Sequence, residues 1–413
     1  HQDTHYLCYF VIVRKNILFI SHSIRDGGPG RSLYYLLKHF DYKNFNVNVL
    51  IPSKDTFSHK IEKADLDVDE IVRPNFPENL KKQNFSLFGK KISIFFIDLF
   101  INLIRLFIML FQMRNIIKDK KIDLIYCNGT QAKIFGSIVG LLYRINIIWH
   151  VRNIQSNIFL KWLLNTCSKI SFVKKIICVS NATRLQFTDK SKTVVINNGI
   201  DTNEYASSKV EGKLRNEFKI DKETIIIGTA GRVVPRKGFE YFIQLAGEIS
   251  HKFKKDCIFV LVGDTPFYFN QKLMQKLKKS VDDLNISKKF IFTGYKSDVE
   301  SYIADFDIFF IPSRYPDPFP RVVIESMSLG KPVIGFNIGG IGEAIDDNIN
   351  GFSLDLDCKD VSAQIVRLIE DNELRMKMGY ESRKKAVSKY DSRIIANKII
   401  NEIHSLVSSS FKA

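Results

Sequence analysis

The stretch that decides the fold is S-R-Y-P-D-P-F-P-R-V-V-I-E-S-M-S-L-G-K-P-V-I-G-F, residues 313–336. The residues before it, 304–312, end in a short apolar run typical of a buried strand, and residues 331–336 form another. Between them a Pro-rich loop leads into a helix whose first turn suits Pro320. The order strand, loop, helix, strand predicts one unit of a parallel α/β sheet.

Two carboxylates lie eight positions apart in this stretch, Asp317 in the loop and Glu325 in the helix. A loop that opens a helix presents free backbone N–H groups at the positive end of the helix dipole, which favours a phosphate. Carboxylates beside such a site can accept hydrogen bonds from sugar hydroxyls. The combination indicates a nucleotide sugar as ligand.

The chain has 413 residues, enough for two domains. Strand-like and helix-like segments alternate from residue 16 to residue 200 and again from residue 224 to residue 336, which predicts two doubly wound parallel sheets. Residues 201–222 are polar and irregular, so we expect the linker there, and the tail 361–407 has a helical pattern. The predicted domains are residues 15–205 and 222–390, followed by a helix in 391–413.

The formal net charge is +17, which indicates either a Lys-rich surface or an anionic partner such as nucleic acid, acidic lipid or a phosphorylated ligand. Six cysteines occur without a C-x-x-C pair. Cys127, Cys178 and Cys257 fall in apolar strand-like runs, so we expect core residues in a reducing compartment rather than zinc or disulfides. We expect no signal peptide, because Leu7–Val13 lacks a basic start and a cleavage site.

Residues 92–111 are unusually apolar, with sixteen apolar residues out of twenty. A membrane span is disfavoured because it would separate strands that belong to one sheet, so we favour a helix of the protein core. The alternative is a helix lying in the membrane surface, attracted to anionic lipid by neighbouring cations. These are Lys90, Lys91, Arg114, Lys118, Lys120 and Lys121.

Three further motifs lie where predicted strands end. Gly27 and Gly28, in G-G-P-G, open a helix after the first strand and allow close approach of a phosphate, although the sequence is not G-x-G-x-x-G. Arg232 and Lys237, in G-R-V-V-P-R-K-G, can neutralise a diphosphate at a helix start. His150 ends a strand of the first domain, where a structural and a functional role are equally consistent with the sequence.

Two D-x-D strings, Asp305/Asp307 and Asp355/Asp357, could in principle hold a divalent cation. Such strings are frequent by chance, and one lies at a helix-to-strand junction. We therefore expect no metal site.

The strings G-R-V-V-P-R-K-G, D-P-F-P-R-V-V-I-E-S-M-S-L-G-K-P-V-I-G and G-G-I-G-E-A-I resemble glycosyltransferase family 4 over roughly residues 16–390. The resemblance implies the GT-B fold, with two Rossmann-like domains facing a central cleft, an N-terminal acceptor domain and a C-terminal donor domain. It implies that the helix in 391–413 packs back on the first domain. It also implies retention of anomeric configuration, without a metal or other cofactor.

Roles for individual residues follow from the resemblance alone. It implies that Arg232 and Lys237 hold the diphosphate, that Glu325 binds the ribose, and that Asp317 contacts the transferred sugar or its acceptor environment. Gly27 and Gly28 then lie near the diphosphate and His150 near the sugar, giving His150, Asp317, Arg232 and Lys237 as catalytic candidates. Asp317 stands where Glu is usual and Pro320 where Gly is common, and we expect Arg321 to add charge near the phosphates.

The expected partners are a UDP- or GDP-sugar donor and a saccharide or lipid-linked acceptor, without nucleic acid. The location expected is the cytoplasm, with contact at the inner face of the membrane, in bacterial surface polysaccharide synthesis. Other classes stay open: a nucleotide-sugar epimerase of the same fold, a nicotinamide oxidoreductase, which lacks its glycine fingerprint here, and a non-enzymatic basic protein that binds membrane or nucleic acid.

Overall fold

The structure is a computed structural model that describes residues 14–21, 28–74, 84–87, 90–93, 95–253, 256–265 and 271–408. The chain forms two compact units. Unit 1 comprises His1–Val151, Trp162–Ile177 and Ile399–Ala413, and unit 2 comprises Arg152–Lys161 and Cys178–Lys398.

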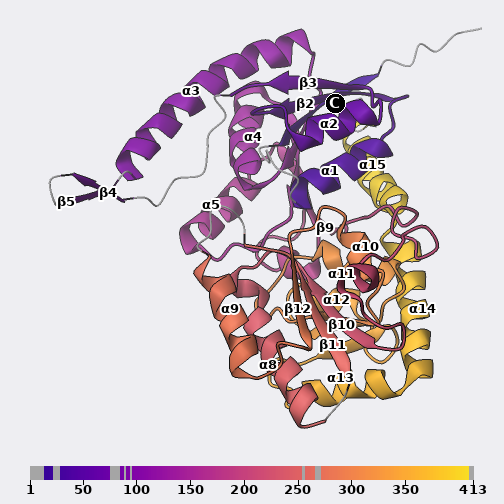
Figure 1. Ribbon diagram of the computed structural model, residues 1–413. Coiled ribbons are helices and arrows are strands. Elements are labelled where there is room, and N and C mark those ends of the chain that lie inside the picture. Colours follow the sequence, from indigo (N-terminus) through magenta and orange to yellow (C-terminus); the bar gives the residue numbers. More distant parts are fainter. Residues whose placement is uncertain are drawn as a thin grey trace, which may run out of the picture. The chain divides into compact units, whose positions relative to one another are not determined.

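A seven-stranded sheet has the order β3-β2-β1-β6-β7-β8-β9 (Figure 1). The pairs β1–β2, β2–β3, β1–β6 and β6–β7 are parallel. The strands are β1 (Lys15–Ser21), β2 (Phe45–Ile51), β3 (Val68–Val72), β6 (Leu124–Asn128), β7 (Asn146–Val151), β8 (Val173–Cys178) and β9 (Thr193–Val195).

Helices connect these strands, as the alternating pattern predicts. They are α1 (Gly28–Lys38), α2 (Thr56–Lys63), α3 (Phe95–Asp119), α4 (Thr130–Tyr143), α5 (Ile158–Ser168) and α6 (Asn181–Arg184). A separate antiparallel hairpin, β4 (Asn84–Leu87) with β5 (Lys90–Ser93), precedes α3.

The second sheet has six strands in the order β12-β11-β10-β13-β14-β15, and each neighbouring pair is parallel. They are β10 (Ile225–Ala230), β11 (Cys257–Val262), β12 (Phe290–Gly294), β13 (Ile308–Ile311), β14 (Val333–Phe336) and β15 (Gly351–Leu354). The helices of this part are α7 (Leu214–Phe218), α8 (Phe239–His251), α9 (Lys272–Asp283), α10 (Val299–Ile303), α11 (Arg321–Ser328), α12 (Ile341–Ala344), α13 (Val361–Glu370) and α14 (Asn372–Lys389), with a short 3-10 turn at Pro235–Lys237.

Successive residues of these strands serve two separate cores, because side chains alternate between the faces of a sheet. In β13, Phe310 packs with Phe242 of α8 in one core, whereas Phe309 packs in the other with Val323 of α11. All four side chains are fully buried. A strand buried on both faces must be apolar throughout, which explains the short apolar runs on which the fold prediction rests.

The last helix, α15 (Ser392–Ser408), enters unit 1 at Ile399. There the His404 ring lies 4.7 Å from the Phe45 ring, and its Nε2 lies 3.1 Å from a carboxylate oxygen of Asp41. Glu402 forms an ion pair with Lys175 at 2.8 Å. These contacts bring the end of the described chain onto the first unit.

The doubly wound α/β prediction is confirmed, and some details differ. Cys127, Cys178 and Cys257 are fully buried, as expected. The predicted strand 194–200 is shorter, since β9 ends at Val195. The region expected to be an irregular linker contains the short helix α7.

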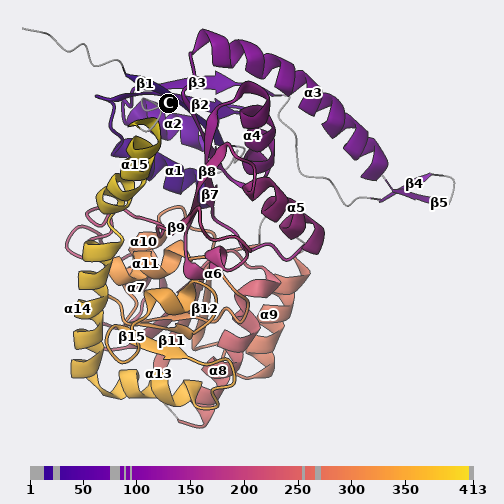
Figure 2. The ribbon, with the colours of Figure 1, turned by 180° about the vertical axis from the view of Figure 1, so that it is seen from behind.

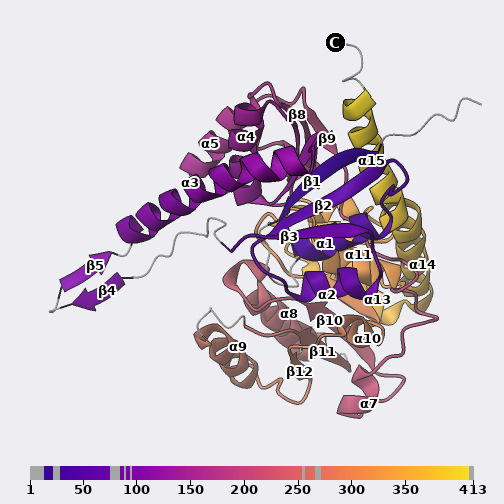
Figure 3. The same ribbon diagram turned by 90° about the horizontal axis from the view of Figure 1, so that it is seen from above.

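The expectation of a core helix at residues 92–111 is wrong. Helix α3 has 25 residues, and within its window Phe100–Asp119 only 17% of the residues are buried. Among the described residues α3 is the one helix long and apolar enough to cross a membrane. As expected, β1 and β2 before the helix share a sheet with β6 after it, which disfavours a span. Figures 2 and 3 show the first half of α3 and the β4–β5 hairpin extending beyond that sheet.

Gly140 allows α4 to lie directly on the adjacent strand. A Cβ atom built there would be 2.3 Å from Ile147 Cδ1 and 2.8 Å from the Ile145 carbonyl oxygen. We predict that Gly140→Ala lowers stability by about 1–3 kcal/mol through overpacking, although alanine favours a helix by roughly 1 kcal/mol. Thermal denaturation measures the effect. The control, Leu141→Ala, changes a 53% exposed neighbour on the same helix, and equal effects of both variants would contradict the packing argument.

Candidate functional site

The candidate site in unit 2 lies where the order of the strands reverses. Strand β10 pairs with β11 on one side and with β13 on the other. The loops that leave β10 and β13 therefore start side by side, at the carboxyl edge of the sheet. Open α/β sheets bind ligands at this kind of switch point.

Close backbone packing holds these two loops together. Gly238, which ends the 3-10 turn, has a φ of +71°, and a Cβ atom there would lie 2.1 Å from the Pro312 carbonyl oxygen. Ser313 donates a hydrogen bond from its hydroxyl to the Arg236 carbonyl at 3.0 Å. Any side chain at Gly238 would force the loops apart, which explains the glycine that ends G-R-V-V-P-R-K-G.

The result is an ion pair between the two predicted site residues Lys237 and Asp317. The Lys237 Nζ atom lies 2.7 Å from Asp317 Oδ2, and the two side chains are only 16% and 15% exposed. Arg232, five residues earlier, is exposed. The structure thus brings together one predicted cation and one predicted carboxylate that are eighty positions apart in sequence.

Two further glycines, Gly339 and Gly340, fix the backbone of Asp317. Gly340 donates its N–H to the Asp317 carbonyl at 2.7 Å. Gly339 has a φ of +61°, and a Cβ atom there would lie 2.4 Å from the same oxygen. The sequence alone indicates no role for these glycines, although G-G-I-G-E carries part of the family resemblance. In the structure, they allow their backbone to lie directly against the loop that carries Asp317 and Pro318.

Glu325 and Arg321 share the first turns of α11, which begins after Pro320. Both side chains are nearly buried, at 5% and 9% exposure, and Arg321 Nε lies 3.4 Å from Glu325 Oε1. Arg321 also donates from Nη1 to the Gly199 carbonyl at 2.9 Å. The guanidinium expected near the phosphates is thus engaged with a carbonyl and a carboxylate. The Glu325 Oε1 atom is buried and accepts no hydrogen bond from the described residues, although it lies 3.4 Å from Arg321 Nε.

The candidate residues of unit 1 gather at the carboxyl edge of its own sheet. His150 is the penultimate residue of β7, lies opposite Asn128 of β6 and is 1% exposed. The Tyr126 hydroxyl lies 2.5 Å from His150 Nδ1, and a hydroxyl that donates there leaves the imidazole proton on Nε2. Asn128 donates to the Pro29 carbonyl at 3.2 Å, which ties the start of α1 to this edge.

Tyr126 and Asn128 were absent from the predicted site, because no motif marks them. Their position at the end of the strand beside His150 is the signal that could have found them. Gly28 is the first residue of α1 and is exposed, whereas Gly27 lies outside the described residues.

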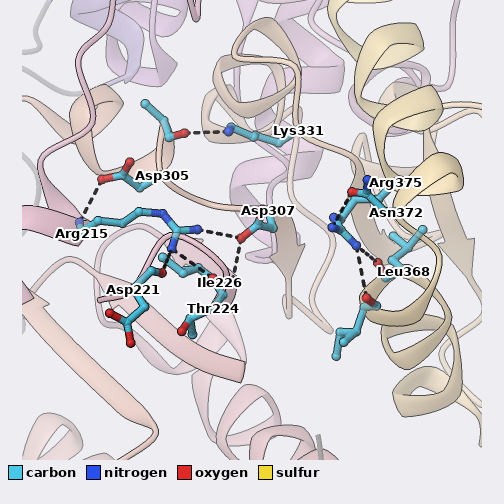
Figure 4. A network of polar contacts seen from close by, with 12 residues as sticks. Arg215, Asp221, Thr224, Ile226, Asp305, Asp307, Lys331, Leu368, Asn372 and Arg375 are labelled. Atoms are coloured by element: carbon cyan, nitrogen blue, oxygen red, sulfur yellow. Dashed lines mark hydrogen bonds and ion pairs between the residues drawn. The ribbon is translucent and has the colours of Figure 1, made fainter. Parts of the chain in front are cut away.

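The first D-x-D string belongs to a structural network (Figure 4). Asp305 accepts the backbone N–H of Arg215, and Asp307 accepts both the Arg215 guanidinium and the Ile226 N–H, at 2.8–3.1 Å. Lys331, whose pKa is lowered by burial, donates to the Ala304 carbonyl at 2.6 Å. These carboxylates anchor the start of β10. In the part of the chain that the structure describes, no group of three or more His, Cys, Asp or Glu residues could hold a metal ion.

Comparison with known proteins agrees with this geometry. Residues 26–204 match the family described as Glycosyltransferase Family 4, and residues 210–385 match Glycosyl transferases group 1. The fold and the site thus define a glycosyltransferase with the GT-B fold. The chain belongs to glycosyltransferase family 4, and the predicted enzyme class is confirmed.

Two curated relatives are each similar over most of the chain. An Escherichia coli UDP-Gal:alpha-D-GlcNAc-diphosphoundecaprenol alpha-1,3-galactosyltransferase is 25% identical over 70% of this chain and 77% of its own length. A Campylobacter jejuni N,N'-diacetylbacillosaminyl-diphospho-undecaprenol alpha-1,3-N-acetylgalactosaminyltransferase is 26% identical over 70% and 79%. The crystal structure of Anabaena HepE with UDP-glucose has a similar fold, with a TM-score of 0.74 and 22% identity over 94% of this chain and 99% of that one.

The Lys237–Asp317 pair leads to a prediction about anion binding. We expect Asp317→Asn to tighten binding of UDP roughly five- to tenfold, because it frees Lys237 and removes a negative charge that repels the diphosphate. Lys237→Met should weaken UDP binding. Titration calorimetry measures both. Asp283→Asn, an exposed carboxylate on α9, controls for net charge, and weaker UDP binding by Asp317→Asn would contradict the argument.

Proposed function

We propose that the protein is a retaining glycosyltransferase that moves a hexose from a nucleotide-diphosphate sugar to a saccharide or lipid-linked saccharide acceptor. The observation that carries the proposal is the convergence of Lys237 and Asp317 at the strand reversal, with Arg232 in the same loop as Lys237. The proposed pathway is bacterial surface polysaccharide synthesis, supported by the names of the two relatives, which act on sugars linked to diphospho-undecaprenol.

Cleavage of the bond between the anomeric carbon and the phosphate leaves negative charge on the nucleoside diphosphate. In the proposed complex Lys237 and Arg232 bind these phosphates, and the free N–H groups at the start of α11 add a positive dipole end. Lys237 must leave Asp317 to do so. Asp317 is then free to accept a hydrogen bond from a hydroxyl of the transferred sugar.

Glu325 is the proposed ligand of the ribose. It is 4% exposed and fixed by α11, so its carboxylate keeps one orientation, and Oε1, which accepts no hydrogen bond from the described residues, has to be uncovered before it can accept a hydroxyl. His150 is proposed to contact the transferred sugar. If Tyr126 donates to its Nδ1, its Nε2 carries a proton and acts as a donor.

UDP is the nucleotide we favour over GDP. The Escherichia coli relative uses UDP-Gal by its name, and the similar Anabaena structure contains UDP-glucose. No metal is needed in this proposal, because fixed cations and backbone dipoles neutralise the leaving group. We place the reaction on the cytoplasmic side of the membrane, where a lipid-linked acceptor would be presented.

The test of the reaction is incubation with a panel of UDP- and GDP-sugars and a diphospholipid-linked monosaccharide. We expect transfer from one donor, an α-linked product from an α-linked donor by NMR, and full activity after a chelator. An inverted product, or loss of activity that Mg²⁺ restores, would contradict the mechanism. Isomerisation of the donor without any acceptor would identify an epimerase instead.

Variants of the phosphate site give the second test. We predict that Arg232→Ala and Lys237→Ala each lower kcat/KM about 100- to 1,000-fold, because each removes charge that stabilises the leaving diphosphate. Steady-state kinetics with the active donor measures this. Arg236→Ala is the matched control, because the Arg236 side chain is exposed and belongs to the same turn. The hydrogen bond from Ser313 goes to the backbone carbonyl of Arg236, which the substitution keeps. Near-normal turnover of both Arg232→Ala and Lys237→Ala would contradict their assignment to binding of the diphosphate.

A further inference from the structure

Helix α3 presents an aromatic stripe to solvent. Phe100, Phe107 and Phe111 are 64%, 72% and 72% exposed, and Leu103 and Ile104 beside them are 46% and 45% exposed. Steps of seven and four residues put the three phenylalanines on one side of the helix. Single exposed apolar residues are common, but a continuous apolar surface of this kind marks an interaction site.

Between Phe100 and Met113, the polar residues of α3 lie on the side that faces the rest of unit 1, and the exposed residues are all apolar. Met109 and Met113 are fully buried there. On the same half of the helix, Asn102, Arg105 and Gln112 are half-buried. A water-exposed helix has the opposite arrangement, with apolar residues inside and polar residues outside. The outward side of α3 therefore fits an apolar environment better than water.

The same stripe changes from aromatic to cationic along the helix axis. Arg114 and Lys118 continue it, three and seven residues after Phe111, and both are exposed. Lys120 is directed elsewhere, since it pairs with Asp69. A surface with phenylalanines followed by one turn of cations matches the boundary between acyl chains and anionic headgroups.

We propose that this stripe inserts into the surface of a bilayer that contains anionic lipid, with Phe107 and Phe111 among the acyl chains and Arg114 and Lys118 at the phosphates. From Phe100 to Phe111 the helix rises about 16 Å, roughly half of a 30 Å hydrocarbon core. The strands on both sides of α3 belong to one sheet, so the helix enters and leaves on the same side. It docks in one leaflet and does not span.

A lipid surface explains the cations better than a second copy of the chain does. In a pair of identical α3 helices, Arg114 and Lys118 would face either the partner's cations or its phenylalanines, and neither arrangement supplies a counter-charge. The formal net charge of +17 also opposes self-association and favours an anionic surface. This inference goes beyond the proposed reaction and does not depend on it, because it requires neither donor nor acceptor.

The experiment is flotation of the full chain with vesicles of phosphatidylcholine, with and without phosphatidylglycerol. We expect binding to the anionic vesicles that weakens as salt is raised. Phe107→Ser/Phe111→Ser should weaken it at least tenfold at any salt concentration. Arg114→Gln/Lys118→Gln should leave weak binding that no longer depends on salt. Because these side chains are exposed, the variants should fold, which a thermal melt checks.

Matched controls lie in unit 2. Tyr295→Ser/Tyr380→Ser removes two aromatic side chains that are 73% and 68% exposed, and Lys272→Gln/Lys276→Gln removes two cations spaced as Arg114 and Lys118 are. Both controls should bind vesicles like the wild type. If a control lost as much vesicle binding as the α3 variants, binding would depend on the overall hydrophobicity or charge of the protein and not on α3. That result would overturn the proposal.

Insertion depth gives a second readout. Trp149 is fully buried and Trp162 is 59% exposed. Phe107→Trp in a Trp162→Phe background therefore places one exposed indole on the stripe. Lipids brominated on the acyl chain should quench it at least twofold more than they quench the parent Trp162→Phe protein. Equal quenching of the Phe107→Trp protein and of its Trp162→Phe parent would overturn the proposed insertion.

Two other results would also overturn the proposal. The first is failure of the wild type to float with anionic vesicles. The second is a wild-type protein that does not bind vesicles and has twice the monomer mass by light scattering, with the monomer mass restored by Phe107→Ser/Phe111→Ser. That result would show that a second copy of the chain covers the stripe. Transfer to a water-soluble acceptor analogue should be unchanged in the stripe variants. Failure of the membrane proposal is therefore distinct from failure of the proposed reaction.

Discussion

The Lys237–Asp317 ion pair is the interaction on which the candidate site depends. It joins the loop after β10 to the loop after β13, two strands that are adjacent in the sheet but far apart in the chain. Both side chains are largely buried, so the pair is poorly screened by water and each charge requires a partner. An anionic ligand can replace Asp317 as the partner of Lys237. In the proposed complex, the geometry that holds Lys237 beside Asp317 also positions this cation for a diphosphate.

Glycines determine how closely the backbone can approach this pair. Gly238 lets one loop contact the Pro312 carbonyl, and Gly339 with Gly340 lets another contact the Asp317 and Pro318 carbonyls. A side chain at any of the three would overlap a backbone oxygen, which cannot move aside as a flexible side chain can. The geometry of the site therefore depends on these three glycines as much as on its charged side chains.

Much of this could be predicted from the sequence, since strands buried on both faces are continuous apolar runs and the charged motifs follow them. The positions of Lys237 and Asp317 were predicted by such motifs, whereas their mutual contact was not, because pairing across a sheet is not local information. Tyr126 and Asn128 were missed for the same reason. Helix α3 was misassigned because hydropathy shows that a segment is apolar but does not show whether protein covers it. Asp305 and Asp307 form a metal-like string, and only their contacts with Arg215 show that they anchor a strand.

The shorter carboxylate at position 317 has a structural consequence. Asp317 reaches Lys237 while its carbonyl accepts the Gly340 N–H, so a single residue connects Lys237 to the segment that leads into α12. Release of Lys237 by a bound diphosphate would change the charge balance at Asp317 without breaking its backbone contact. The carboxylate then stays at the carboxyl edge of the sheet with a free oxygen and can turn toward a sugar hydroxyl. In the proposed complex, binding of the phosphates and orientation of the sugar contact are in this way coupled through the Asp317 side chain.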